Sequence, residues 1–247
     1  MVMKIRKRIL IISLTLLAGF TCSAGAVTKG MKKVIDDALD FSVKQSMSMF
    51  NEMKDQKGIL PRTAENGKMI TCESAWWTSG FYPGTLWYCY EYSNDPQIRA
   101  AAEEMTSRVE QQKYTTSNHD VGFIINCSFG NGYRLTHNET YRKVIETAAK
   151  SLSTRFHPVT GCTRSWNSKK WQFSVIIDNM MNLELLNVAS SLTGDNAYYN
   201  MAKSHADRTM INHFRPDGSS YHVVSYDTIT GKVLNQVTHQ GVNDQSS

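Results

Sequence analysis

Apolar residues recur along most of the chain at intervals of three to four positions, which is the period of an α-helix. The first such stretch is Lys29–Met53, and the pattern stops near the helix breakers Gly58 and Pro61. Beyond Gly80 the same period returns in pairs of segments joined by short polar turns. We therefore expect one long helix near the N-terminus, followed by helical hairpins.

The expected hairpins share one design, with a first helix, a short polar turn and a second helix. Their bounds are Pro83–Tyr92 with Ile98–Gln112, Val121–Leu135 with Tyr141–Arg155, and Asn179–Leu192 with Tyr198–His213. The turns begin at Ser93, Thr136 and Thr193, which lie 43 and 57 residues apart. Each turn offers polar side chains that can cap the second helix, and alanines on the second helices allow close packing. Such a repeat is typical of an open solenoid or a closed α/α toroid.

The pattern changes between residues 219 and 237, where apolar and polar side chains alternate on both sides of Thr230-Gly231-Lys232. Alternation around a turn that contains glycine predicts a β-hairpin. The expected fold class is therefore all-α, built of αα-hairpins, with one small β-hairpin near the C-terminus.

Residues 1–26 have the features of an export signal. Four basic side chains without an acid precede a 12-residue, mostly apolar run, and Ala24-Gly25-Ala26 is typical of a cleavage site. We expect residues 27–247 to form the mature domain, exported to the periplasm or secreted. An N-terminal membrane anchor is the alternative, whereas the residues before Cys22 match a lipoprotein signal poorly.

The remaining composition excludes several classes of protein. The net charge of +5 belongs mostly to the N-terminal segment, because 23 basic and 22 acidic side chains remain without it, so no nucleic-acid partner is expected. No later stretch is apolar enough to span a membrane, so no membrane association is expected after cleavage. Four cysteines remain with no zinc or disulfide spacing, so free thiols and no metal site are expected. The oligomeric state stays open.

Two aspartates, Asp120 and Asp178, directly precede the first helices of successive hairpins. The N-termini of such helices lie on a common rim, so both carboxylates can face one pocket. The segments at this rim also hold several aromatic residues, which are Trp76, Trp77, Tyr82, Trp166 and Trp171. Aromatic faces with paired carboxylates are typical of a sugar site. The alternatives are that the aspartates are N-caps and that the aromatic residues are packing residues.

Four motifs, in order, resemble those of the unsaturated glucuronyl hydrolases, glycoside hydrolase family 88. They are Trp76–Gly84, His119–Phe123, Ile177–Leu183 and Thr238–Gly241. The resemblance covers essentially the whole chain after residue 26. It implies an (α/α)6 toroid that hydrates the 4,5-unsaturated uronate left on glycosaminoglycan fragments by a polysaccharide lyase. The alternatives are an unsaturated rhamnogalacturonyl hydrolase acting on pectin fragments and an exported, non-catalytic carbohydrate-binding scaffold.

The same resemblance assigns roles to individual residues. It makes Asp178 the general acid/base and Asp120 its partner. The implied substrate contacts are Trp77, His119, Trp166, His222, His239 and Gln240. No metal or organic cofactor is implied. One tension remains, because a helix N-terminus lowers the pKa of a carboxyl group whereas an acid catalyst needs that pKa raised.

The length of the chain also bears on this expectation. Six hairpins at the observed period need roughly 300 residues, whereas the segment 27–247 has 221. The resemblance therefore predicts a C-terminally truncated member, with the N-terminal two-thirds of the catalytic domain and an incomplete toroid. An arginine of the family that helps to bind the substrate carboxylate is absent, so we expect the chain alone to have little activity and low stability.

Overall fold

The computed structural model describes residues 28–242, so the predicted signal segment 1–26 lies outside the described residues. The described residues divide into two compact units, the first ending at Phe41 and the second beginning at Ser42. Helix α2 (Lys29–Met53) begins in the first unit and ends in the second, with the bounds that the sequence predicts. Within the described range, no helix is both long and apolar enough to cross a membrane.

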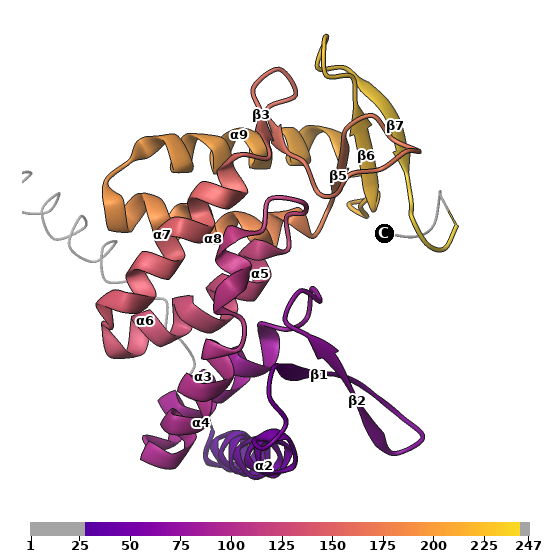
Figure 1. Cartoon of the computed structure of the whole chain (residues 1–247). Coiled ribbons are helices and arrows are strands. Elements are labelled where there is room, and N and C mark those ends of the chain that lie inside the picture. The colour runs from indigo at the N-terminus through magenta and orange to yellow at the C-terminus, as the bar shows by residue number, and fades with distance from the viewer. Residues whose placement is uncertain (1–27, 243–247) are drawn as a thin grey trace, which may run out of the picture. The chain divides into compact units, whose positions relative to one another are not determined.

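Helical hairpins make up most of the second unit (Figure 1). They are α3 (Phe81–Ser93) with α4 (Pro96–Ser107), α5 (Val121–Ile125) and α6 (Asn131–Thr136) with α7 (Glu139–Ser153), and α8 (Asn179–Thr193) with α9 (Asn196–Asn212). The predicted αα-hairpin framework is therefore confirmed. Two details differ from the expectation. A π-helical turn over Asn126–Gly130 separates α5 from α6, and α4 ends at Ser107, before a separate 3₁₀ turn over Glu110–Tyr114.

The three hairpin turns repeat one hydrogen-bonded design. Each first helix ends at a residue in the left-handed conformation, which is Asn94, His137 or Gly194. The next residue accepts a hydrogen bond from the backbone N–H two positions on, and this residue is Asp95, Asn138 or Asp195. The side chain therefore satisfies one of the free N–H groups at the start of the second helix. The capping role predicted for these turns is confirmed.

The cap at α9 leads to a stability prediction. Replacement of Asp195 by Ala removes the 2.8 Å hydrogen bond from the Ala197 N–H, and should lower the free energy of unfolding by about 1 kcal/mol. Urea denaturation measures this change. Asp195→Asn is the matched control, because its amide oxygen still accepts the bond, and it should retain most of the stability. An equal loss in both variants would contradict the capping explanation.

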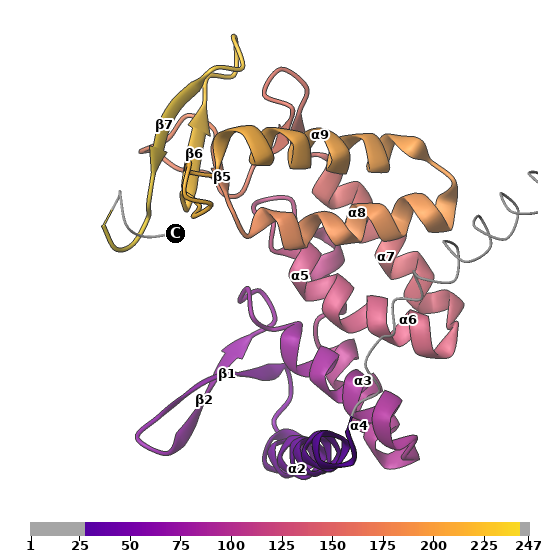
Figure 2. The same ribbon diagram turned by 180° about the vertical axis from the view of Figure 1, so that it is seen from behind.

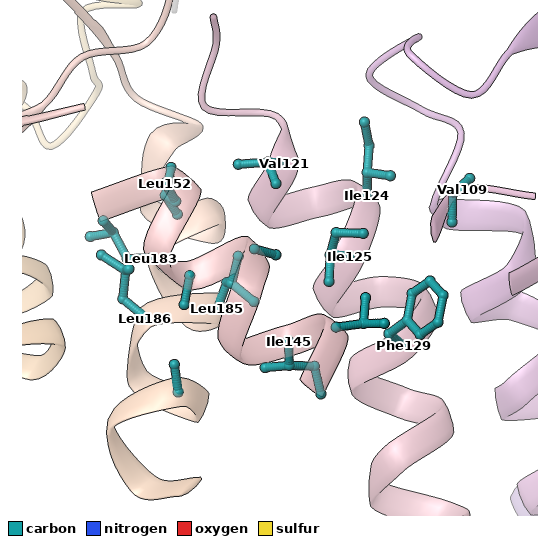
Figure 3. Close-up of a cluster of buried hydrophobic side chains, with 14 of the residues drawn as sticks. Val109, Val121, Ile124, Ile125, Phe129, Ile145, Leu152, Leu183, Leu185 and Leu186 are labelled. Atoms are coloured by element: carbon teal, nitrogen blue, oxygen red, sulfur yellow. The ribbon is translucent and has the colours of Figure 1, made fainter. Parts of the chain in front are cut away.

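The main hydrophobic core lies between the helices of the second and third hairpins. Figure 3 shows its members, which include Ile124 and Ile125 of α5, Ile145 of α7, and Leu183 and Leu186 of α8. Three alanines of the second helices α7 and α9 belong to it as well, which are Ala148, Ala149 and Ala202. The core therefore holds together the two hairpins that carry the candidate aspartates.

Two glycines of the motifs allow the first helices to approach closely. A Cβ atom on Gly80 would lie 2.5 Å from the Cα atom of Ile124, and one on Gly122 would lie 2.6 Å from the Cα atom of Asn182. These distances are too short for any side chain, and the opposing atoms are backbone. Glycine at both positions therefore sets how closely α3 approaches α5 and how closely α5 approaches α8.

The strands form small antiparallel sheets. The sequence predicted one β-hairpin among them. That hairpin is β6 (Val223–Tyr226) with β7 (Val233–Val237), and the two strands lie side by side in both Figure 1 and Figure 2. A third strand, β5 (Ser174–Ile176), pairs with β6 and was not predicted. Two further hairpins were also missed, β1 (Ile59–Glu65) with β2 (Lys68–Glu73) and β3 (Phe156–His157) with β4 (Cys162–Thr163).

The β1–β2 hairpin corrects the interpretation of the segment after α2. Gly58 and Pro61 predict the end of a helix, whereas the residues that follow Gly58 form the strand β1. The dipeptide Asn66-Gly67 forms the turn, with φ angles of 49° and 73°, and Asn-Gly is a strong hairpin signal between two strands. This dipeptide is the local signal for the hairpin.

Candidate active site

A pocket of about 540 Å³ opens beside the N-terminal ends of the first helices α5 and α8. Its lining residues are Trp77, His119, Asp120, Trp166, Ile176, Ile177, Asp178, His222, His239 and Gln240. The structure therefore places all eight residues that the sequence analysis assigned to a site around one cavity. They come from six separate stretches of the chain.

The three-stranded sheet brings the last of these stretches to the aspartates. Ile176 of β5 pairs with Val223 of β6, and the Ile177 N–H donates to the His222 carbonyl oxygen at 3.0 Å. The backbone N–H of His239 in turn donates to Nδ1 of His222 at 3.3 Å. This register puts Asp178, His222 and His239 at one end of the sheet, although 61 positions separate the first from the last.

Asp178 occupies the N-cap position of α8, but its side chain does not cap the helix. Its Oδ1 atom is buried and has no hydrogen-bond partner. Burial raises the pKa of Asp178 to about 6, and the charge of Asp120 raises it further, whereas backbone N–H groups at the helix start oppose the rise. The desolvation of the carboxyl group therefore outweighs the helix N-terminus. This result resolves the tension between a helix-start position and an acid with a raised pKa.

Asp120 stands at the corresponding position before α5 and makes no capping hydrogen bond either. The N-cap interpretation is therefore wrong for both aspartates. Burial raises the pKa of Asp120 to about 6, and the charge of Arg155 acts in the opposite direction. Two carboxyl groups whose pKa values are raised by burial in one pocket are typical of a functional site.

His119 connects Asp120 to the interior of the molecule. Asn182 of α8 accepts a hydrogen bond from the Phe123 N–H through Oδ1 at 2.7 Å, so its other terminal atom is the NH₂ group. That group lies 3.2 Å from Nδ1 of His119 and can only donate, so Nδ1 must accept. The imidazole proton therefore resides on Nε2, which lies 3.3 Å from Oδ1 of Asp120. Burial lowers the pKa of His119 to about 3, so the ring is neutral.

The tautomer of His119 is testable without any substrate. Asn182→Leu removes the donor to Nδ1, so we expect a mixture of the two neutral tautomers in place of one. The ¹⁵N chemical shifts of the His119 ring measure this ratio. The variant also leaves the Phe123 N–H without its acceptor, which should cost about 1–3 kcal/mol of stability.

The exposed Asn187 of the same helix provides the matched control. Asn187→Leu should leave the His119 tautomer unchanged. A single Nε2-protonated ring in Asn182→Leu would contradict the assignment of Asn182 as the group that sets the tautomer.

Two tryptophans form part of the pocket wall. The Trp77 ring is 44% exposed and packs edge-on against Phe81. The Trp166 ring contacts His119 and His239, with ring centroids 6.3 and 5.8 Å away. Both rings combine a packed edge with a surface on the cavity, which suits the apolar face of a sugar.

The other aromatic residues expected at this rim serve packing. Tyr82 is a buried residue of α3, and its hydroxyl donates to the Ser46 carbonyl oxygen at 2.8 Å. Trp171 is buried against Trp166. Trp76 lies outside the pocket, with the Arg62 guanidinium 4.0 Å above its ring. The packing interpretation therefore fits these three residues.

Three residues at or beside the pocket were not predicted. Ile176 and Ile177 supply an apolar part of its wall, and Asn182 orients His119. Asn182 had a usable signal, because it is a polar residue four positions after Asp178 on the apolar face of a helix. An asparagine buried at such a position must find hydrogen-bond partners.

None of the four cysteines of the described range lines this pocket. All four cysteines are free, with Cys89 and Cys162 buried and Cys72 and Cys127 half-buried. Between residues 28 and 242, no group of three or more His, Cys, Asp or Glu side chains is arranged to hold a metal ion.

Comparisons with known proteins agree with this geometry. The chain is 47% identical to an unsaturated glucuronyl hydrolase of Formosa agariphila over 174 residues, which are 69% of this chain and 44% of that protein. It is 33% identical over 219 residues to an unsaturated chondroitin disaccharide hydrolase of Streptococcus pyogenes serotype M1, covering 86% of this chain and 54% of that protein. No protein-family model matches the chain.

Solved structures with a similar fold are named for the same enzymes. The crystal structure of an unsaturated glucuronyl hydrolase specific for heparin matches with a TM-score of 0.79 and 43% identity, covering 85% of this chain and 57% of that chain. The αα-hairpins with small β-hairpins correspond to the α/α-toroid fold of such structures. The chain spans about half the length of the curated relatives that it matches.

Proposed function

We propose that this chain, which belongs with the unsaturated glucuronyl hydrolases in sequence and fold, binds a 4,5-unsaturated uronate in the pocket and provides the acid/base pair for its hydration. The observation that carries the proposal is the pair of aspartates with raised pKa values, both lining one pocket with two tryptophans. The products are the hydrated uronate, released as its open-chain C5 ketone, and the shortened oligosaccharide.

The reaction begins at the vinyl ether of the unsaturated sugar. Protonated Asp178 donates its proton to C4, and positive charge develops on C5 and the ring oxygen. Water adds at C5 and returns a proton to the Asp178 carboxylate, which leaves a hemiketal. The hemiketal opens to a C5 ketone, and the hemiacetal at C1 then releases the neighbouring sugar. One water is consumed, and the aspartate ends as it began.

The surrounding charges divide the roles between the two aspartates. Burial raises the pKa of Asp120, but the positive charge of Arg155 lowers it and so favours the ionised form of that carboxyl group. Burial and the negative charge of Asp120 both raise the pKa of Asp178, which favours its protonated form. Asp178 therefore holds the shared proton, and ionised Asp120 stabilises the positive charge and positions ring hydroxyls.

The substrate class is proposed from the pocket wall and the relatives. Trp77 and Trp166 stack on or flank the sugar ring, and His119, His222, His239 and Gln240 provide polar contacts. The relatives are named for heparin and chondroitin substrates, which supports a glycosaminoglycan fragment over a pectin fragment.

The test measures loss of the ultraviolet absorbance of the 4,5-double bond. Residues 27–247 are assayed alone, and also fused to the C-terminal part of the Formosa agariphila relative that the chain does not match. We expect the fusion to hydrate unsaturated chondroitin or heparin disaccharides and not unsaturated rhamnogalacturonan disaccharides. The reverse preference would favour the pectin alternative, and binding without absorbance loss would favour a non-catalytic scaffold. The absence of both binding and turnover would overturn the proposal.

We also propose that residues 1–26 direct export and are removed, on the sequence pattern described above. Edman sequencing of exported material should begin at or near Val27. Material that begins at Met1, or at a lipidated Cys22, would contradict this proposal.

A further inference from the structure

A second, polar pocket of about 260 Å³ shares no lining residue with the candidate active site. Its lining residues are Thr116, Thr154, Arg155, Phe156, His157, Arg164, Asn167, Phe173 and Thr228. The lining contains two guanidinium groups and an imidazole but no carboxylate. Since the share of liquid volume taken by one water is about 30 Å³, the pocket has room for an ion and several waters.

The two arginines lie close together, and neither forms a salt bridge within the described residues. Within residues 28–242, no carboxylate oxygen lies within 4.0 Å of either guanidinium, although other arginines of the second unit form such pairs. Arg155 is buried, and burial together with the charge of Arg164 lowers the pKa of Arg155 to about 10, although the charge of Asp120 acts in the opposite direction. Two like charges held together at a buried position are costly unless a negative charge joins them.

Backbone carbonyl groups use only part of the hydrogen-bonding capacity of these arginines. Arg155 donates to the carbonyl oxygens of Arg164 and Thr116 at 2.8 and 2.6 Å, and Arg164 donates to that of Gln172 at 2.9 Å. A guanidinium has five N–H donors, so several remain. Nε of Arg164 and Nδ1 of His157 are buried and have no partner.

We propose that this pocket binds a tetrahedral oxyanion of the sulfate type, held between Arg155 and Arg164 with Asn167 and the threonine hydroxyls around it. A doubly charged oxyanion compensates both guanidiniums at once, and its four oxygens match their forked donors. The ion is either free sulfate, which carries both charges, or a sulfate ester on a sugar, which carries one charge and offers three terminal oxygens to the same donors. The proposal does not depend on the reaction at the candidate active site.

A purely structural role for the two arginines is the competing explanation. In that case their carbonyl hydrogen bonds tie the loop after α7 to its neighbours, and added anions bind no better here than elsewhere. The two explanations differ in whether the pocket takes up an oxyanion in a saturable way.

The test is an NMR titration of the arginine Nε–H signals in the full chain with sodium sulfate, at constant ionic strength set by sodium chloride. We expect saturable shifts of the Arg155 and Arg164 signals at millimolar sulfate, with acetate at least tenfold weaker. Glucosamine 6-sulfate is the second arm, and tighter binding than free sulfate would identify a sulfated sugar as the ligand. Equal effects of sulfate, acetate and chloride would overturn the proposal.

Two variants connect the binding to the pocket. Arg164→Gln should weaken sulfate binding at least tenfold, whereas Arg134→Gln, which removes an exposed arginine already paired with Glu91, should leave it unchanged. If Arg164→Gln fails to fold by circular dichroism, the exposed Asn167→Ala provides the second variant and should weaken binding severalfold. Wild-type affinity in the folded pocket variant would show that the shifts come from another site.

Discussion

Asp178→Asn should lower the hydration rate of the fused protein by roughly 10²–10⁴-fold or more, because an amide cannot deliver a proton to C4. The geometry supports a large effect without a loss of fold. The Asp178 side chain makes no capping hydrogen bond that the amide would lose. The initial rate of absorbance loss with an unsaturated disaccharide measures the change, and binding of the disaccharide should remain.

The same variant should be more stable than the wild type at neutral pH. The folded-state pKa of Asp178 is raised from 3.8 to about 6. Its contribution to stability is therefore complete below about pH 4, where the group is protonated in both states, and is lost as the pH rises through 6. At pH 7 the buried carboxylate is charged at a cost, and the neutral amide avoids it. We expect a gain of about 1–2 kcal/mol at pH 7, after allowance for partial exposure, that disappears near pH 4.

An exposed carboxylate provides the control for both measurements. Asp207 pairs with Lys203 on the surface of α9, so Asp207→Asn should change neither the rate nor the pH dependence of stability noticeably. Normal turnover by Asp178→Asn would remove that residue from the catalytic role. A loss of stability at pH 7 would contradict the burial of an unsatisfied charge.

Gly122→Ala should destabilise the second unit by at least about 2–3 kcal/mol, because the added methyl group has no space. Its Cβ atom would lie 2.6 Å from both the Cα and the carbonyl oxygen of Asn182. These backbone atoms can move only if α5 and α8 separate. The separation would also displace Asp120 from Asp178 and Asn182 from His119, so activity should fall together with stability. Thermal unfolding followed by circular dichroism measures the first effect.

Gly30 of α2 is the matched control, since a Cβ atom there meets nothing within 4 Å. Gly30→Ala replaces a glycine in a helix and should leave the melting temperature unchanged or slightly higher. A Gly122→Ala variant as stable as Gly30→Ala would show that the close approach of α5 and α8 is not required.

The helices were predictable because their signals are local. The period of apolar residues placed α2 and the three hairpins, and the capping side chains Asp95, Asn138 and Asp195 marked where the second helices begin. The π-helical turn at Asn126–Gly130 was not predictable in this way, because an apolar period does not distinguish a π turn from a continuous helix. The β1–β2 hairpin was not predicted, although the dipeptide Asn66-Gly67 is a strong signal for a hairpin turn.

The composition of the site was predicted partly by residue type and partly by resemblance. The position of Asp120 and Asp178 before successive first helices follows from the hairpin repeat itself. His222, His239 and Gln240 came only from the resemblance, because nothing local in residues 219–241 connects them to an aspartate. The pairing of β5 with β6 is the long-range contact that joins them, and its three residues are too few to show an alternating pattern.

The sequence by itself thus determined the helical hairpins, their capped turns and the residue types available at one rim, since these depend on neighbours within a few positions. Only the tertiary structure decided how those residues act. A position at a helix start predicts that Asp120 and Asp178 cap their helices, but neither side chain makes a capping hydrogen bond. Burial depends on the whole fold, and it raises the pKa of both carboxyl groups. The tautomer of His119 is likewise set by Asn182, a residue 63 positions away that close packing at Gly122 brings into contact.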